Sequence, residues 1–300
     1  MSKREKVVVT GAAGFVGSHL CRALVEEFDV IALNTTRERE LPQEVTFIQA
    51  DCRDTKKLQD LFQGVIYVFH AAALPRVQYS IEYPLETHDV NVSGTLSVLF
   101  AAKESGVKKV VYSASSSAYG NQDEMPLRED MPARPMSPYG LQKYTGELYS
   151  RMFSEVYNLP TVSLRYFNVY GPEASTEGAY ALVIAKFLKQ RLEGKPMTIT
   201  GDGGQTRDFT HVRDIVRANI LAAKSPKVGK GEVINIGAGR NASVNQIAAL
   251  IGGPVEYIPA RLEPHDTLAD NQLAKKLLGW KPIVSLEDGI AELKKLHGIR

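Results

Sequence analysis

Short apolar runs rich in β-branched residues alternate with longer amphipathic stretches through the first two-thirds of the chain. Most of the apolar runs are continuous, as expected for parallel strands that are covered on both faces. The predicted strands are 6–10, 29–33, 46–50, 65–70, 110–113 and 161–166. The helices predicted between them are 17–27, 55–62, 91–105 and 138–157. This alternation predicts an α/β fold with a doubly wound parallel sheet.

The alternation becomes less regular after residue 168. The pattern there predicts helices near 180–193, 212–224, 244–251, 271–278 and 286–296, with a short strand after residue 196 and another over 232–236. We therefore expect a second, smaller unit of mixed helices and strands to follow the main sheet.

Composition and charge exclude several classes of protein. The chain has 300 residues, of which 44% are hydrophobic and 23% charged, the balance of a globular protein. Its net charge is only +2 and it has no long basic run, so we expect no nucleic-acid partner. It contains no signal peptide and no apolar span of membrane length, so the sequence predicts a cytoplasmic protein without a membrane partner.

The cysteines and histidines narrow the chemistry further. Cys21 and Cys52 are the only cysteines, which excludes a disulfide framework and suits a reducing compartment. The six histidines include no pair four residues apart and no carboxylate-rich cluster. We therefore predict no metal site.

Three glycines separate the first predicted strand from the first predicted helix. Gly11, Gly14 and Gly17 form the pattern G-x-x-G-x-x-G. Glycine permits the tight turn and lets backbone N–H groups approach a pyrophosphate, toward which the helix N-terminus directs about half a positive charge. This context predicts a dinucleotide site, which also includes Phe15 and Val16.

The second and third predicted strands end at residues placed to contact an adenosine. Dinucleotide folds usually have an acidic residue at the end of the second strand, where it binds the ribose hydroxyls. Here the strand is followed by Asn34, which does not repel a 2′-phosphate, and Arg37 could pair with one. NAD and NADP therefore both stay open as cofactors. Asp51 and Cys52, after the third strand, are placed to touch the adenine edge.

Tyr139 and Lys143 stand four residues apart and share one face of the predicted helix 138–157. A free phenol has a pKa of about 10 and is a poor base at neutral pH. A nearby ammonium and a cationic nicotinamide both favour the phenolate and lower that pKa. The serine-rich run 113–117 ends a predicted strand, where the ligand crevice of a doubly wound sheet forms. A hydroxyl there can bind the substrate oxygen beside the phenol.

Together these motifs resemble the extended short-chain dehydrogenase/reductase family, and within it the nucleotide-sugar epimerases of the UDP-glucose 4-epimerase type. The resemblance runs almost from end to end and rests on segments 7–20, 70–73, 91–95, 112–120, 137–143, 165–172, 207–212 and 278–282. It implies a Rossmann-type domain over 1–168 and about 205–238, which binds the dinucleotide. It also implies a smaller α+β domain over 169–204 and 239–300, which binds the nucleotide sugar.

The resemblance implies a role for each matched residue. Tyr139 would be the base for the sugar hydroxyl, Lys143 would hold the ribose, and Ser115 would bind the reacting oxygen. The other cofactor positions that it implies are Ala71, Ala72, Ala73, Asn91, Ser113 and Tyr166. The substrate positions that it implies are Ser117, Asn168, Arg207, Arg261 and Thr267. At Arg261 the chain is one residue shorter than the family's Arg-x-Gly-acid pattern. Thr267 occupies the position of a gate that limits the bulk of the sugar, and a small residue there would admit an N-acetyl group.

Two positions at which this chain differs from other members of the family reduce the number of reactions to consider. The 4,6-dehydratases carry Asp-Glu directly after the catalytic hydroxyl residue, and the decarboxylases keep a Glu at the second place, whereas this chain has Ser116 and Ser117. We therefore favour an NDP-sugar 4-epimerase that acts on UDP-glucose and UDP-galactose or on their N-acetyl forms.

Two alternatives stay open, an NADP-dependent 4-keto-sugar reductase and a non-catalytic dinucleotide-sensing protein. Asn34 and Arg37 motivate the reductase, and the shared fold alone motivates the sensor. Helices 91–105 and 138–157 resemble the pair through which the family forms homodimers, so we expect a homodimer.

Overall fold

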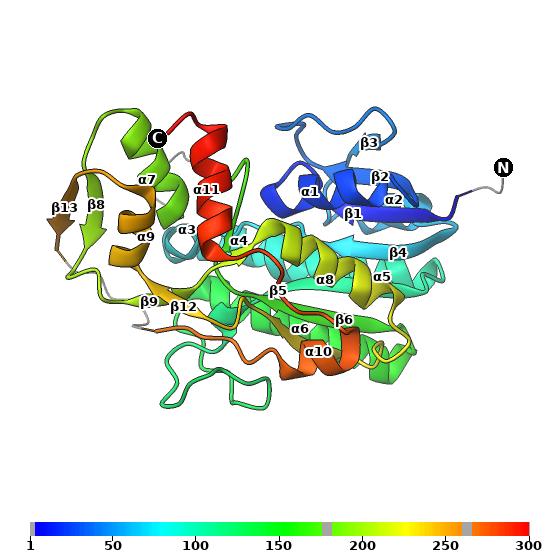
Figure 1. Cartoon of the computed structure of the whole chain (residues 1–300). Coiled ribbons are helices and arrows are strands. Elements are labelled where there is room, and N and C mark those ends of the chain that lie inside the picture. The colour runs from blue at the N-terminus through cyan, green and yellow to red at the C-terminus, as the bar shows by residue number, and fades with distance from the viewer. Residues whose placement is uncertain (1–3, 176–181, 260–265, 300) are drawn as a thin grey trace.

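The computed structural model describes residues 4–175, 182–259 and 266–299. Its central sheet consists of β1 (Lys6–Thr10), β2 (Asp29–Asn34), β3 (Thr46–Gln49), β4 (Val65–His70), β5 (Lys109–Ser115), β6 (Thr161–Tyr166) and β11 (Glu232–Ile236). These strands are parallel and lie in the order β11-β6-β5-β4-β1-β2-β3 (Figure 1). The predicted α/β class with a doubly wound sheet is therefore confirmed.

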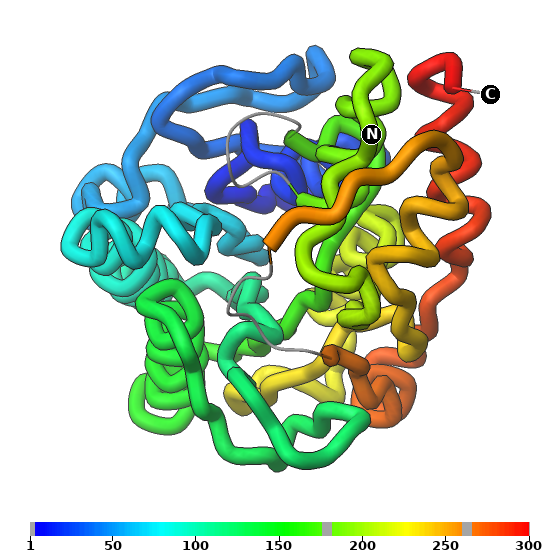
Figure 2. Tube along the Cα trace, turned by 90° about the vertical axis from the view of Figure 1, so that its left-hand side faces the viewer, coloured from blue at the N-terminus to red at the C-terminus, as the bar shows by residue number. Residues whose placement is uncertain are grey.

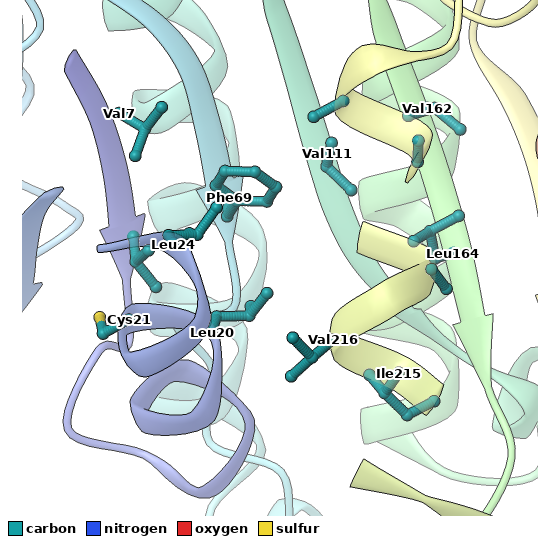
Figure 3. Packing of buried hydrophobic residues seen from close by; sticks show 14 of the residues in the cluster. Val7, Leu20, Cys21, Leu24, Phe69, Val111, Val162, Leu164, Ile215 and Val216 are labelled. Atoms are coloured by element: carbon teal, nitrogen blue, oxygen red, sulfur yellow. The ribbon is translucent and has the colours of Figure 1, made fainter. Parts of the chain in front are cut away.

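Helices cover both faces of this sheet. One face is covered by α1 (Phe15–Leu24), α8 (Val212–Lys224) and α10 (Gln272–Leu278), and the other by α2 (Thr55–Leu61), α5 (Gly94–Glu104) and α6 (Pro138–Tyr157). Within β1, Val7 and Val9 pack on the first face while Val8 packs on the second. Figure 3 shows Leu20 of α1 and Ile215 of α8 packed in the first of these layers. The central strands are mostly apolar because neither of their faces meets water.

A separate apolar cluster lies beside the sheet. It involves α7 (Val183–Leu192), β8 (Met197–Thr200), α9 (Val244–Ile251) and α11 (Leu286–Leu296), and β13 (Val255–Ile258) pairs with β8. These elements gather at the left of Figure 1. Phe187, Ile247 and Ile290 lie in its core. By contrast, Leu278 and Trp280 near α10 pack in the core of the main sheet.

The structure adds short elements that the sequence pattern did not predict. They are α3 (Val77–Glu82), α4 (Pro84–His88), the π-helical turn Asp89–Ser93, the 3₁₀ turn Ser116–Ala118, β7 (Val169–Tyr170), β9 (Thr206–Asp208), β10 (Thr210–His211), β12 (Asn241–Ser243) and β13. Each of them has six residues or fewer, too few to show a clear period.

Several predicted boundaries were wrong by a few residues. The first helix begins at Phe15 rather than 17 and ends at Leu24, because the amides of Glu27 and Phe28 both turn back to the Leu24 carbonyl. The predicted helix 91–105 is divided into the π-helical turn and α5. The bounds of β1, β4, β6, β11, α6, α8, α9 and α11 are as predicted.

Two features of the described residues concern membranes and metal ions. Every helix in them is too short or too polar to cross a membrane. The same residues contain no group of three or more His, Cys, Asp or Glu side chains arranged to hold a metal ion.

Candidate active site

The turn between β1 and α1 is shaped by close backbone contacts. Gly11 has a φ of +67°, and a Cβ on it would lie 2.6 Å from the backbone nitrogen of Ala72. A Cβ on Gly17 would lie only 2.1 Å from the Gly11 carbonyl oxygen. Gly14 precedes α1 without a side-chain cap, and the first turn of α1 contains no acidic residue. Its N–H groups are therefore available to an anion such as a pyrophosphate.

Most predicted cofactor residues lie at one edge of the sheet. They follow the carboxyl ends of parallel strands: Asn34 at β2, Asp51 and Cys52 after β3, Ala71, Ala72 and Ala73 after β4, Ser113 in β5 and Tyr166 at the end of β6. The glycine turn follows β1, and Phe15 and Val16 begin α1 beside it. The strand order reverses between β1 and β4, and doubly wound sheets bind ligands at such a point.

The end of β2 carries polar groups that already have partners in the protein. Asn34 Nδ2 donates a hydrogen bond to the carbonyl of Thr36 over 2.8 Å. The guanidinium of the exposed Arg37 lies 5.5 Å from the centre of the Phe47 ring, a cation–π contact. This contact gives the Arg37 guanidinium a partner within the protein.

Asp51 and Cys52 make different contacts. Arg53 donates to both carboxylate oxygens of Asp51 and, mainly through these bonds, lowers its pKa. The Cys52 thiol is buried against α5, where a Cβ on Gly94 would lie 2.6 Å from its sulfur. Burial raises the pKa of this thiol to about 12. The Cys52 side chain therefore has a packing role.

The N-terminus of α6 is held by two serines. The Ser137 hydroxyl accepts from the Gly140 amide over 3.1 Å, the bond typical of an N-cap residue. The hydroxyl of Ser80, in the unpredicted helix α3, accepts from the amide of Tyr139 over 3.0 Å. Gly146 allows close packing on β5, because a Cβ there would lie 2.2 Å from the Tyr112 hydroxyl. These contacts fix the position of Tyr139 relative to the sheet.

The structure brings Ser115, Tyr139 and Lys143 together. The buried Lys143 ammonium donates to the carbonyl of Ser113 over 2.7 Å, which anchors it to β5. Burial lowers the pKa of Lys143 to about 8, and the Glu147 carboxylate acts in the opposite direction. Burial raises the pKa of the Tyr139 phenol, and its hydrogen bond with the Ser115 hydroxyl acts against that rise. The predicted lowering of the Tyr139 pKa is therefore not found in the protein alone.

Asn91 lies in the π-helical turn and ties three segments together. Its Oδ1 accepts from the Leu74 amide over 2.8 Å, and its Nδ2 donates to Gln142 Oε1 over 2.8 Å. Gln142 Nε2 in turn donates to Thr87. Gln142 is not among the predicted site residues, although a polar residue on the buried face of an amphipathic helix is a signal that could have revealed it.

Three predicted substrate residues converge around Asp208. Asn168 Nδ2 donates to the Asp208 carbonyl over 3.2 Å and lies 3.4 Å from the Thr267 hydroxyl. That hydroxyl accepts from the Asp208 amide over 3.3 Å, and Arg207 precedes Asp208 in β9. Ser117 lies in the turn after β5, two residues from Ser115. Arg261 lies outside the described residues.

Comparisons with known proteins agree on one family. Residues 7–237 match the NAD dependent epimerase/dehydratase family. The chain is 36% identical over 297 residues to a putative UDP-glucose 4-epimerase of Methanocaldococcus jannaschii, with 95% of each protein covered.

Two solved structures are similar over nearly the whole chain. One is UDP-N-acetylglucosamine 4-epimerase from Methanobrevibacter ruminantium M1 in complex with UDP-N-acetylmuramic acid, which is 34% identical with a TM-score of 0.91 and covers 98% of this chain and 99% of that one. The other is UDP-glucuronic acid 4-epimerase from Bacillus cereus in complex with UDP-glucuronic acid and NAD. It is 34% identical with a TM-score of 0.88, and the coverage is again 98% and 99%.

The family match begins in β1 and ends just after β11. It therefore includes the whole central sheet, the glycine turn and the helix that carries Tyr139 and Lys143. The chain belongs to the NAD dependent epimerase/dehydratase family.

Proposed function

We propose that this protein is an NDP-sugar 4-epimerase that uses bound NAD and acts on UDP-sugars. The observation that carries the proposal is the grouping of Ser115, Tyr139 and Lys143 beside a glycine turn shaped for a pyrophosphate. The 4-epimerases among its relatives support the same reaction.

The residues at the carboxyl edge of the sheet fit a dinucleotide. The uncapped N-terminus of α1 would hold the pyrophosphate, and the absence of side chains at Gly11 and Gly17 permits the tight turn beside it. Asn34 would face the adenosine ribose. NAD, when bound, supplies a reversible hydride acceptor whose nicotinamide ring carries positive charge.

The side chains of the protein handle the proton. Tyr139 Oη accepts the proton of the sugar C4 hydroxyl and later returns it to the same oxygen, while Ser115 Oγ binds that oxygen. Lys143 holds the ribose and keeps an ammonium close to the phenol. Because burial lowers the pKa of Lys143 to about 8, this ammonium is retained below that pH. Positive charge beside Tyr139 favours its phenolate and opposes the effect of burial.

The neighbours of Ser115 support epimerisation over elimination. Positions 116 and 117 hold serines where the resembling dehydratases carry acids that eliminate water. Neither hydroxyl is an acid at neutral pH. The chain therefore has the groups for oxidation and reduction at C4 but not those for the elimination.

Asn34 and Arg37 are the features that favoured the alternative, an NADP-dependent 4-keto-sugar reductase. The contact of Arg37 with Phe47 gives that guanidinium a place in the fold without a 2′-phosphate. Mass spectrometry of small molecules released from the purified protein tests the cofactor directly. We expect NAD, and the release of NADP instead would contradict the proposal.

Substitution of Gly17 by alanine should weaken NAD binding by about tenfold or more and lower stability by roughly 1–3 kcal/mol. The added Cβ would overlap the Gly11 carbonyl, so the turn must shift. NAD titration and thermal unfolding measure the two effects. Gly64→Ala is the control: it places an alanine in open space, at a φ of +72° and outside the glycine turn, so it should lower stability without weakening NAD binding. Unchanged NAD affinity in Gly17→Ala would argue against the pyrophosphate position.

We propose that two parts of the chain, each with its own apolar core, bind different ligands. Residues 1–168 with about 205–238 bind NAD, and 169–204 with most of 239–300 bind the nucleotide sugar. Support comes from the separate core of α7, β8, α9 and α11. Within the second range, α10 contacts β11 and α8 and so packs with the cofactor part.

We also propose that the protein forms a homodimer through α5 and α6. Figure 2 shows these helices side by side at the left of the molecule, and they contact each other. Phe100 of α5 and Leu141 and Leu148 of α6 are each more than 40% exposed. Such exposed apolar side chains on neighbouring helices are typical of an interface.

The substitution Leu148→Glu should therefore raise the dissociation constant of the dimer by about 100-fold, because each subunit would bury an unpaired carboxylate. Sedimentation over a range of concentrations measures this. Leu192→Glu, at a slightly more exposed site on α7, is the control and should stay dimeric. A wild-type protein that sediments as a monomer would rule out the homodimer.

A further inference from the structure

We propose that Ser117 is a positioning residue that fixes the direction in which the Ser115 hydroxyl donates its proton. This inference rests on the proposed function, because it concerns the group that binds the reacting oxygen. It gives Ser117 a role through Ser115 rather than through its own contact with the sugar.

Two hydrogen bonds from the same residue reach Ser115 Oγ. Ser115 is the last residue of β5, and the chain turns directly after it into the 3₁₀ turn. The Ser117 hydroxyl donates to Ser115 Oγ over 2.8 Å, and the Ser117 amide donates to the same atom over 3.2 Å. No side-chain bond from the intervening Ser116 to this oxygen is found within the described part of the chain.

The bonding capacity of a hydroxyl then decides the orientation. A serine hydroxyl has one hydrogen and two lone pairs. Because Ser117 occupies both lone pairs of Ser115 Oγ, the Ser115 hydrogen must point away from Ser117. The Ser115 hydroxyl also acts to lower the pKa of Tyr139, which is the effect of a hydroxyl that donates to the phenol oxygen. Ser115 is therefore held as a donor toward the space beside the phenol.

The helix that carries Tyr139 is seated on the same turn. A Cβ on Gly140 would lie 2.7 Å from the carbonyl oxygen of Ser117, so α6 packs directly on Ser117. Ser117 therefore links the two segments of the site: its hydroxyl and amide bind Ser115, and its carbonyl lies against Gly140, the residue after Tyr139. This geometry keeps the Ser115 hydroxyl and the Tyr139 phenol in fixed relation.

A fixed donor is useful because negative charge develops on the sugar oxygen as its proton leaves. A donor that already points at that oxygen pays no reorientation cost when the charge appears. The two bonds that Ser115 accepts also polarise its O–H group and strengthen the bond that it donates. Without the Ser117 hydroxyl, one lone pair of Ser115 is freed and its O–H group can rotate to accept instead of donate.

A double-mutant cycle tests this role. The variants are Ser117→Ala, Ser115→Ala and the double variant, with Ser116→Ala as a matched control and Ser117→Thr as the conservative rescue. The loss of one hydrogen bond of about 0.5–1.5 kcal/mol lowers kcat by roughly 2- to 13-fold in Ser117→Ala. We expect KM to change little, the threonine variant to recover most of the rate, and Ser116→Ala to match wild type.

The double variant separates the two roles of Ser117. If Ser117 acts through Ser115, the double variant is no slower than Ser115→Ala alone. If the two losses multiply, or if Ser117→Ala mainly raises KM, Ser117 contacts the sugar itself and the proposal fails.

The cycle is measured on the single-turnover appearance of bound NADH after a UDP-sugar is added, as well as on epimer formation. A non-additive cycle without epimer formation contradicts the proposed function but keeps the role of Ser117. A multiplicative cycle with intact epimerisation contradicts the role of Ser117 alone. If UDP-glucose, UDP-N-acetylglucosamine and UDP-glucuronic acid all yield no NADH and no epimer, the proposed function and the role of Ser117 are both overturned.

Discussion

Replacement of Tyr139 by phenylalanine should lower the turnover number by roughly 10²–10⁴-fold, the range for the loss of a general acid–base group. The substitution removes only the phenolic oxygen and leaves the ring, so the seating of α6 on Ser80 and Ser137 stays intact. The measurement is the rate of epimer formation at saturating UDP-sugar. The NAD content of the same protein shows whether the cofactor site is preserved, and we expect it to be unchanged.

A second tyrosine on the same helix provides the matched control. Tyr149 lies ten residues further along α6 and packs against an apolar cluster of the main sheet. Tyr149→Phe should keep the wild-type rate. A Tyr139→Phe variant with near wild-type turnover would remove Tyr139 from the role of base and with it the proposed mechanism.

The largest effect on stability is expected from the buried ion pair beneath the active site. Arg165 donates two hydrogen bonds to Glu147, over 2.9 and 2.7 Å, and both side chains are less than 5% exposed. The Arg165 guanidinium also lies 4.4 Å from the centre of the Tyr119 ring. Arg165→Met should lower the free energy of unfolding by about 3–5 kcal/mol, because it leaves the Glu147 carboxylate buried without its partner.

The pH dependence of this variant has a definite sign. Burial raises the pKa of Glu147, and Arg165 acts against that rise, so removal of Arg165 raises it further. When the pKa of a carboxyl group is higher in the folded than in the unfolded protein, the folded protein becomes less stable as pH rises through that pKa. The deficit of Arg165→Met should therefore be larger at pH 8 than at pH 5.

Chemical denaturation at the two pH values measures this deficit. Arg134→Met removes an arginine from an exposed pair with Asp123 and should cost at most about 1 kcal/mol. The double variant Arg165→Met with Glu147→Leu should recover most of the loss, because no buried charge is left unpaired. Equal effects of Arg165→Met and Arg134→Met would mean that the buried pair does not contribute as described.

The sequence predicted the parts of the fold whose pattern is local. Continuous apolar runs identified the central strands, and α6 begins at the predicted residue, where Ser137 is the N-cap and Pro138 follows it. The glycine turn was likewise predictable, because at each of its glycines a Cβ would lie within 3.0 Å of a backbone atom. Short elements such as α3 and β9 were missed, since they are held by tertiary contacts rather than by a period of their own.

The site was less predictable where its residues act through contacts between distant segments. Ser80 binds the amide of Tyr139, and Gln142 binds Asn91, across 59 and 51 residues of sequence. The spacing of residues along the sequence does not predict hydrogen bonds between segments that are this far apart. Cys52 is a further case: its position after β3 predicts a place at the adenine edge, whereas the inward direction of its side chain, against Gly94, comes from packing that the sequence does not show.

The most direct test of the central claim combines sugar analysis with the nicotinamide signal in one sample. The purified protein, with its bound NAD and no added reductant, is incubated with an excess of each UDP-sugar, and NMR follows the sugars while absorbance follows NADH. The account predicts that at least one UDP-sugar reaches equilibrium with its C4 epimer over many turnovers, without net accumulation of NADH. Accumulation of a keto sugar with stoichiometric NADH, or conversion only when NADPH is supplied and consumed, would contradict it.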